Sequence, residues 1–406
     1  MIENSGGIKR ILVATTLYPN ANQNRHGIFV ETRLRQLLKT GEVEARVVAP
    51  VPWFPFKISS MEQYSVYADV PVYEQRNGIE VFHPRYLVIP KIGMLLTPFF
   101  LAITLFFCAR KIRKNGFKFE LLDGHYFYPD GVATALVAKL LKVPYLITAR
   151  GTDINLISSY KIPRKMIRWA AKNAAGNITV STALKEKLTD LGVPADKVHV
   201  LRNGVDSELF VIGDAQKIRK EMKLTGNVLV SVGNLVEPKG HALVIQALKN
   251  LPGFHLLIIG LGEQLGALQT LANELDVSDR VQYIGEQSQT DLAKIYSAAD
   301  LLILASSREG WPNVLLESMA CGTPVVATRV GGTPEIVKAP EAGQLIATRS
   351  SDAIVAGIQQ VLNSPPRPED TRKYAQKFSW GQTISGLTDL LDKIMIHSTP
   401  NTAKSQ

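Results

Sequence analysis

The segment Ser307–Gly331, SREGWPNVLLESMACGTPVVATRVG, decides the fold of this 406-residue chain. An apolar run that begins at Asp300, DLLILA, precedes it and predicts a buried strand. Pro312 suits the start of a helix, because it lacks the amide hydrogen that a first turn leaves unpaired. We therefore expect a helix from about Asn313, ended by Cys321–Gly322. Its first amide hydrogens and its positive dipole end would favour a diphosphate above the strand.

Two carboxylates stand beside the start of this expected helix. Glu309 precedes it, and Glu317 lies about one turn inside it. An acid beside an anion site is electrostatically unfavourable, so each needs a purpose such as holding sugar hydroxyls. Taken alone, each would be explained as well by a solvated acid. Together with the string ACGTPVVAT that follows, the pair resembles the donor-site signature of the family 4 retaining glycosyltransferases, and the likeness extends over most of the chain.

Length, cysteine content and charge bound the class of protein. A chain of this length exceeds what one hydrophobic core usually serves, so two domains are expected. The two cysteines, Cys108 and Cys321, stand in apolar surroundings, which favours a reducing cytoplasm over a disulfide framework. Residues 1–205 hold 28 Lys and Arg against 15 Asp and Glu, and residues 206–406 hold 18 against 21. The basic first half predicts an anionic partner: a nucleic acid, a membrane surface or a phosphorylated acceptor.

The first half alternates strands with helices, which predicts a mostly parallel sheet that binds ligands at the carboxyl ends of its strands. In the resembling family, the loop that holds Gly27 touches the donor diphosphate, usually through two adjacent glycines. Only one glycine is present here. The expected strands are Arg10–Ala14, Ala45–Ala49, Phe119–Asp123, Pro144–Thr148, Asn177–Val180 and Lys197–Leu201.

Two further loops of the first half carry candidate catalytic residues. His125, at the end of a strand, suits proton handling or hydroxyl binding, although a buried structural histidine is an equal alternative. Arg150 stands where much of the family has a histidine that contacts the transferred sugar, and Asp153 follows in the same loop. A guanidinium cannot shuttle protons at neutral pH, but it can hold phosphate or carboxylate. Either His125 takes part of the missing role, or the chemistry needs no histidine.

The second half repeats the alternation, with strands expected at Val228–Val232, His255–Ile259, Arg280–Ile284, Asp300–Leu304 and Pro324–Ala327. Lys239 matches one of two cations that grip diphosphate in the family, whereas Asn234 replaces the other. Arg150 could offset that loss. The glycine-rich turn at Gly260 departs from a dinucleotide fingerprint in its spacing, so NAD is discounted. The resemblance assigns the nucleotide sugar to Gly27, Asn203, Asn234, Lys239, Gly285, Glu286, Asn313, Val314, Leu315 and Glu317.

Two stretches of the first half suggest a membrane surface. Met94–Cys108 is strongly apolar and is followed by basic residues, but it is shorter than a membrane span and contains Pro98. A buried or interfacial helix is expected there. Lysines and arginines recur at helical spacing from Lys161 to Lys172, which suits either anionic lipid or a solvated basic face. No interleaved pattern of aromatic residues in the basic half as a whole supports nucleic acid.

These observations predict an α/β protein of two doubly wound domains facing across a cleft, the GT-B architecture. The resemblance implies a retaining glycosyltransferase of surface polysaccharide synthesis, with Glu309, His125, Arg150 and Asp153 at the reacting sugar. A UDP-sugar is favoured over a GDP-sugar as donor, and the expected acceptor is a saccharide or a lipid-linked saccharide. No cofactor is expected, and no metal either, since no Asp-x-Asp triplet occurs. An epimerase, a phosphorylase and a non-catalytic membrane binder are the alternatives. The expected domains are 1–205 for the acceptor, with a helix at 380–396 packed on it, and 206–379 for the donor, followed by a disordered tail at 397–406. The protein is expected in the cytoplasm, with its first domain resting on the inner face of the membrane.

Overall fold

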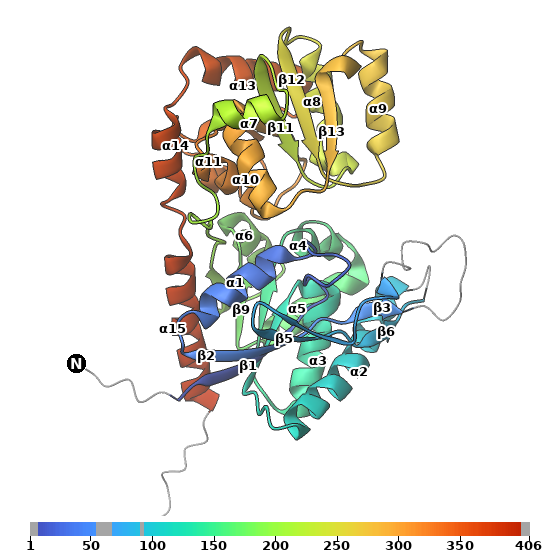
Figure 1. Ribbon diagram of the computed structural model, residues 1–406. Coiled ribbons are helices and arrows are strands. Elements are labelled where there is room, and N and C mark those ends of the chain that lie inside the picture. The colour runs from blue at the N-terminus through green and yellow to red at the C-terminus, as the bar shows by residue number, and fades with distance from the viewer. Residues whose placement is uncertain (1–6, 54–66, 90–92, 399–406) are drawn as a thin grey trace, which may run out of the picture. The chain divides into compact units, whose positions relative to one another are not determined.

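A computed structural model describes residues 7–53, 67–89 and 93–398 (Figure 1). The chain divides into two compact units. The first runs to Arg202 and resumes at Gln382, and the second spans Asn203–Gly381. Arg202 ends the first unit three residues before the boundary expected from the sequence. Of the expected tail, residues 399–406 lie outside the described part of the chain, and the last helix continues to Ser398.

The first unit is built on an eight-stranded sheet of order β10-β9-β8-β7-β1-β2-β5-β4. All neighbouring strands are parallel except β4 and β5, which form a hairpin turned by Asn77 and Gly78, both at positive φ. The sequence analysis missed this hairpin and the separate pair β3–β6. The strands are β1 Lys9–Ala14, β2 Val43–Val48, β3 Val51–Trp53, β4 Tyr73–Arg76, β5 Ile79–Phe82, β6 Arg85–Leu87, β7 Leu121–His125, β8 Tyr145–Ala149, β9 Gly176–Thr179 and β10 Val198–Val200.

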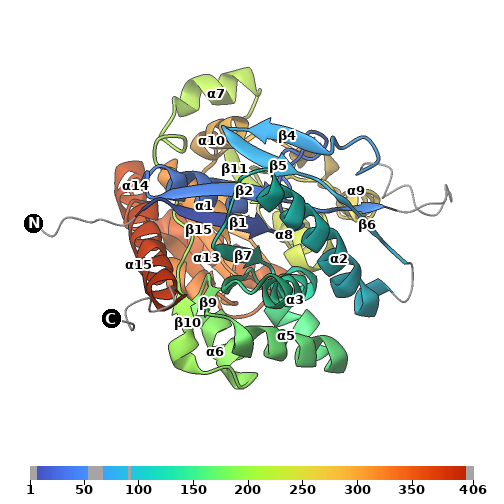
Figure 2. The same ribbon diagram turned by 90° about the horizontal axis from the view of Figure 1, so that it is seen from below.

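Helices α2, α3 and α5 lie side by side on one face of this sheet, as Figure 2 shows. Each precedes a strand of the sheet, so their carboxyl ends meet at the amino edge of the strands. The last helix, α15, also belongs to this unit beyond Gly381, and its Asp392 pairs with Lys9 at 2.7 Å. The helices are α1 Ile28–Leu38, α2 Gly93–Lys114, α3 Val132–Leu141, α4 Thr152–Asn155, α5 Lys161–Asn173, α6 Thr182–Asp190 and α15 Trp380–Ser398.

Helix α2 is longer than the apolar run that predicted it, because the helix continues through the basic residues Arg110–Lys114. One of its faces is buried through Leu101, Leu105 and Ile112. The opposite face leaves five apolar side chains exposed at helical spacing. The helix is therefore only partly buried, and its exposed face is apolar over much of its length. Among the described residues it is the one helix whose length and composition would allow it to cross a membrane. Of its most apolar 18-residue stretch, 28% is buried. The exposed side chains are Met94, Leu96, Phe99, Ile103 and Phe107.

The second unit contains a six-stranded parallel sheet of order β13-β12-β11-β14-β15-β16. Its apolar strands pack against helices on a core of Leu, Ile and Val side chains. Five of its strands were expected, and β16 was missed. The elements are β11 Asn227–Val232, β12 Phe254–Ile259, β13 Val281–Gly285, β14 Leu301–Leu304, β15 Val325–Thr328, β16 Gly343–Ile346, α7 Ala215–Glu221, α8 His241–Leu248, α9 Leu265–Glu274, α10 Gln289–Ala298, α11 Asn313–Ala320, α12 Thr333–Ile336, α13 Ser351–Asn363 and α14 Pro368–Ala375.

Each sheet reverses its strand order once. In the first unit the chain builds outward from β1 through β2, then returns to place β7 on the other side of β1. In the second it builds from β11 through β12 and β13, then places β14 on the other side of β11. Ligands of doubly wound sheets bind outside the carboxyl ends of the two strands where the order reverses. The loops after β1, β7, β11 and β14 are therefore where a site is expected.

Candidate active site

The two strands at the reversal point of the second sheet carry an ion pair. Lys239 lies in the loop after β11, and its Nζ is 2.6 Å from Oε1 of Glu309 in the loop after β14. The lysine side chain is 30% exposed and the glutamate side chain 10%. The pair therefore stands at the surface of the carboxyl edge with part of its charge open to a ligand. The sequence analysis singled out both residues without predicting that they touch.

Backbone contacts hold the two loops together around this pair. The amide of Ser307 donates to the Pro238 carbonyl at 2.8 Å. Arg349 donates to the carbonyl oxygens of Ala305 at 2.9 Å and Glu237 at 2.9 Å, so one guanidinium bridges both loops. A side chain at Gly331 would put its Cβ 1.9 Å from the Glu309 carbonyl oxygen, and this residue has φ +52°. Only glycine permits that approach without strain.

Helix α11 begins beside the pair, as the sequence predicted. Pro312 occupies its N-cap, and the first amide bonded within the helix is that of Leu315, which donates to the Pro312 carbonyl at 3.1 Å. The amides of Asn313 and Val314 thus head the helix, where the dipole is positive. Asn203 is fixed here: its carbonyl accepts from Trp311 Nε1 at 3.0 Å, and its Nδ2 donates to Asn313 Oδ1 at 3.2 Å.

The other predicted donor-site residues of the second unit lie on the same edge. Glu317 is half-buried one turn into α11 and accepts from the Tyr296 hydroxyl at 3.4 Å. Asn234 and Glu286 are exposed after β11 and β13. Gly285 ends β13, and its carbonyl accepts from the Gly260 amide at 2.9 Å. The edge is therefore polar along its length, with the Lys239–Glu309 pair in its two central loops.

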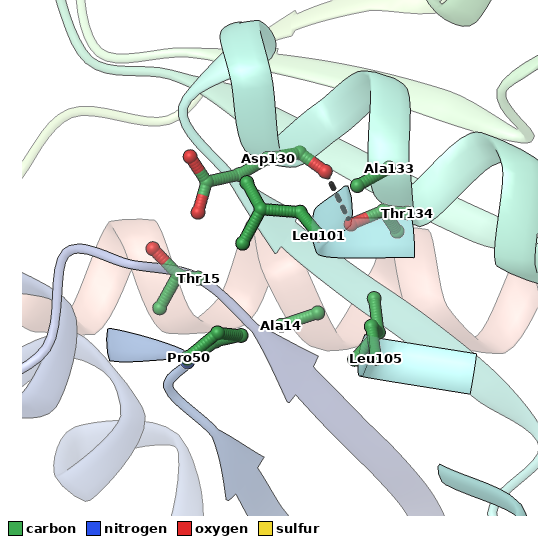
Figure 3. Close-up of a pocket in the computed structure, with 8 residues that line it drawn as sticks. All are labelled: Ala14, Thr15, Pro50, Leu101, Leu105, Asp130, Ala133 and Thr134. Carbon is green, nitrogen blue, oxygen red and sulfur yellow. Dashed lines mark hydrogen bonds between the residues drawn. The ribbon is translucent and has the colours of Figure 1, made fainter. Parts of the chain in front are cut away.

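The loop after β1 in the first unit is held by a buried acid that the sequence analysis missed. Asp130 accepts from the backbone amide of Thr16, and from the Thr16 hydroxyl at 3.1 Å. Figure 3 shows Asp130 above a small cavity of about 10 Å³ lined by Leu101 and Leu105. Burial in these surroundings raises the pKa of the Asp130 carboxyl to about 7. The two strands at the reversal point are thus joined through a carboxyl that titrates near neutrality.

Gly27 was expected to approach a phosphate, but contacts within its own loop already require a glycine at this position. It heads α1 at φ +68°, and a Cβ there would lie 2.3 Å from the Leu17 carbonyl carbon. Neighbouring His26 donates through Nε2 to the Thr16 carbonyl at 3.0 Å. These contacts require a glycine whether or not a ligand binds, so they give no support to the phosphate role.

His125 and Arg150 come together, although they were predicted from separate loops. Arg150 Nη2 donates to His125 Nδ1 at 2.5 Å, and His125 Nε2 lies 3.3 Å from Asp123 Oδ2. Because Nδ1 accepts, the ring proton must sit on Nε2 and point at Asp123. Burial, reinforced by Arg150, lowers the pKa of His125 to about 4 despite Asp123. The imidazole is therefore neutral, and both of its nitrogens are engaged.

Arg33 and Asp153 complete this cluster. Arg33 of α1 is 2% exposed and donates through Nη1 to the Thr148 hydroxyl at 3.1 Å; sequence reasoning missed it, because its burial follows from packing against a strand more than a hundred residues away. Asp153 accepts from the backbone amides of Phe127 at 2.8 Å and Gly151 at 2.8 Å. Asp153 therefore fixes the loops that carry its neighbours, and its role at the reacting sugar stays a prediction.

Comparison with known proteins identifies the family. A model of the group 1 glycosyl transferases matches residues 214–378, and a model of glycosyltransferase family 4 matches residues 63–209. The chain is a glycosyltransferase with one domain of family 4 and one of group 1. A similar relative is the Bacillus subtilis (strain 168) protein named as a teichuronic acid biosynthesis glycosyltransferase, TuaC, at 28% identity over 86% of this chain and 88% of the relative.

Solved structures agree on the fold of this glycosyltransferase. Sucrose-phosphate synthase from Thermosynechococcus elongatus matches with a TM-score of 0.78 and 19% identity, over 96% of this chain and all of that one. HepE of Anabaena in complex with UDP-glucose matches with a TM-score of 0.72 and 18% identity, over 95% of this chain and all of that one. Two Rossmann-like units with these neighbours constitute the GT-B fold, as the sequence predicted.

Proposed function

We propose that this enzyme transfers a sugar from a UDP-sugar to a hydroxyl of a saccharide acceptor, with retention at the anomeric carbon. One observation carries the proposal: Lys239 and Glu309 pair at 2.6 Å at the strand-order reversal of the second unit. A cation is needed there to hold a departing diphosphate, and a carboxylate to hold the hydroxyls of a sugar that becomes cationic. The UDP and UDP-glucose complexes of HepE support a UDP-sugar over a GDP-sugar.

In this proposal the parts of the edge act on different parts of the donor. Lys239 has three N–H donors, so it can bind a phosphate oxygen while one N–H still reaches Glu309. The amides that head α11, at Asn313 and Val314, take the rest of the diphosphate charge. Glu317 binds the ribose hydroxyls. Asn234, Gly285 and Glu286 border the nucleotide, on the resemblance to the family alone.

The state of His125 favours a reaction without a histidine base. A general base needs a free lone pair within reach of the proton it takes, and Nδ1 of His125 already accepts from Arg150. The acceptor hydroxyl's proton would then pass to the departing diphosphate, which needs it as negative charge develops. Arg150 keeps the role of binding an oxygen of the sugar or of the diphosphate. No metal is required in this scheme, because Lys239 and the helix start supply the positive charge.

The first unit offers a pocket for the saccharide acceptor. A cavity of about 160 Å³ lies beside the loop after β1 and is lined by Tyr18, His26, Tyr67 and Tyr86, with Asn20 at its wall. Aromatic faces and short polar side chains suit a sugar ring, which has apolar faces and a polar edge. We propose that the acceptor is lipid-linked and that the enzyme works on the cytoplasmic side of the membrane. The exposed apolar side chains of α2 support this placement.

Product analysis tests the proposed function. Wild-type protein is incubated with UDP-glucose, UDP-galactose or GDP-mannose and an acceptor mixture, and released nucleotide and products are followed by mass spectrometry and NMR. Transfer to acceptor with release of UDP and an unchanged anomeric configuration is expected. Conversion of one UDP-sugar into another would instead indicate an epimerase, and inversion would exclude the retaining scheme. Full activity in EDTA is expected, and loss of activity that Mg²⁺ or Mn²⁺ restores would overturn the metal-free scheme.

A further inference from the structure

A second open pocket lies in the first unit, on the sheet edge opposite to the loops of the candidate site. It occupies about 550 Å³ between the carboxyl ends of α3 and α5 and the start of β8. Its apolar lining includes Ala138, Ala175 and Trp169. Nothing in the proposed reaction uses this pocket, because substrates of a parallel sheet bind at the other edge.

The charged side chains that line this pocket are all cationic: Lys139, Lys142 and Lys197. Lys197 donates to the carbonyl oxygens of Lys172 at 3.1 Å and Ala174 at 3.5 Å, so it completes the end of α5. Within the described part of the chain, no carboxylate pairs with Lys139 or Lys142. Lysines near helix ends offset the helix dipole, but that effect explains neither the cavity nor the tryptophan in its wall.

The surroundings of the pocket are basic and apolar together. Leu140, between the two lysines, is 65% exposed. The neighbouring helix α2 ends at the same edge with Arg110, Lys111 and Lys114 exposed, and its apolar side chains Ile103 and Phe107 are exposed next to them. Helices α2, α3 and α5 form one layer in both views (Figures 1 and 2). A surface of this kind matches a bilayer interface, where acyl chains meet anionic headgroups.

We propose that the pocket between α3 and α5 binds the phosphate of an anionic phospholipid, while the apolar side chains of α2 enter the bilayer beside it. Lys139 and Lys142 would contact the phosphate oxygens. Trp169 would lie at the depth where amphipathic rings prefer to sit. A nucleic acid partner would leave the exposed row from Met94 to Phe107 without an apolar counterpart. The inference rests on the proposed placement at a membrane, and it adds a headgroup site distinct from the reaction edge.

The test is sedimentation with vesicles of phosphatidylcholine alone or mixed with phosphatidylglycerol. Wild-type protein should bind only the mixed vesicles, and less in high salt. Lys139→Gln with Lys142→Gln should weaken binding about thirtyfold, since each basic residue near anionic lipid contributes a factor of about five. Lys217→Gln with Lys220→Gln removes the same charge from exposed positions on α7 of the second unit and is the matched control.

A variant that keeps the charge tests whether vesicle binding needs the pocket or only the basic charge of the surface. Ala175 is exposed and lines the pocket, so Ala175→Phe fills it without changing charge or a buried position. It should weaken binding at least about fivefold, whereas Val211→Phe, an exposed apolar site in the second unit, should not. Unchanged binding of Ala175→Phe, equal losses in the two lysine pairs, or no binding by wild type would each overturn the headgroup site. Sugar transfer to a soluble acceptor, measured on the same variants, should be unchanged, so a failed proposal here is distinguishable from a failed reaction scheme.

Discussion

Replacing Lys239 by alanine breaks the ion pair between Lys239 and Glu309, at the strands where the order of the second sheet reverses. The removed Nζ lies 2.6 Å from Glu309, whose side chain is only 10% exposed. If Lys239 binds the diphosphate, one charge-assisted contact of about 2–3 kcal/mol is lost, and the Kd for UDP rises about 30- to 150-fold. The carboxylate of Glu309 then stays beside the diphosphate without a cation to offset its charge. The rise in the Kd for UDP should therefore lie toward the upper end of this range. Stability should change little, because the lysine is partly solvated.

The companion variant Glu309→Gln should behave in the opposite way. It keeps the size of the side chain, releases Lys239 from its partner and removes a negative charge beside the diphosphate, so UDP affinity stays the same or improves. Turnover should fall about a hundredfold or more, since the sugar loses a carboxylate in the transition state. Calorimetry with UDP and steady-state assays measure the two effects, with Lys249→Ala at the exposed end of α8 as a charge-matched control. Unaltered UDP affinity in Lys239→Ala, or equal affinity losses in both variants, would refute the assigned roles.

Three further outcomes are expected. Burial raises the pKa of Asp130 to about 7, so the folded state retains a proton that the unfolded chain releases above about pH 4. The free energy of unfolding of the wild type should therefore fall between about pH 4 and 7 and level off above, whereas that of Asp130→Asn should lack this fall. Melting temperatures that change in parallel with pH in the two proteins would contradict this prediction. Glu317→Gln should weaken UDP binding about tenfold with turnover at saturating donor preserved, and a loss of turnover alone would place Glu317 at the sugar instead. Trp311→Phe removes the bond from Nε1 to the Asn203 carbonyl and should cost about 1–2 kcal/mol in denaturant unfolding, with an unchanged midpoint showing that this bond does not stabilise the fold.

Elements with strong local signals were predictable from the sequence. The core strands are short runs of Val, Ile and Leu between turn residues, and α11 was placed within a residue because proline and glycine mark its ends. The β4–β5 hairpin carried a local signal as well, in Asn77–Gly78, which favours a tight turn at positive φ. β16 was harder to predict, because it is four residues long and begins at Gly343.

Contacts between distant residues were beyond the sequence. Lys239 and Glu309 were each identified, but they stand 70 positions apart, and only the strand order of the sheet brings them together. The same applies to Asp130, which reaches Thr16 across 114 positions, and to Arg33, whose guanidinium is buried by a strand formed much later in the chain. Their sequence surroundings resemble an ordinary loop acid and an ordinary helix arginine. The arrangement of His125 with Arg150 likewise depends on two neighbouring strands, β7 and β8.

The first unit is discontinuous, and this constrains how the chain is made. Its last helix supplies Leu390 against Gly176 of β9 and Asp392 against Lys9 of β1. A ribosome that has completed Arg202 has not yet synthesised that helix, so most of the first unit emerges before the second unit but lacks the helix that packs on its sheet until translation has passed Gln382. The second unit, encoded without interruption, can fold in the interval. Truncation near Gly381 would therefore destabilise the first unit, which loses its last helix, and leave the second unit complete.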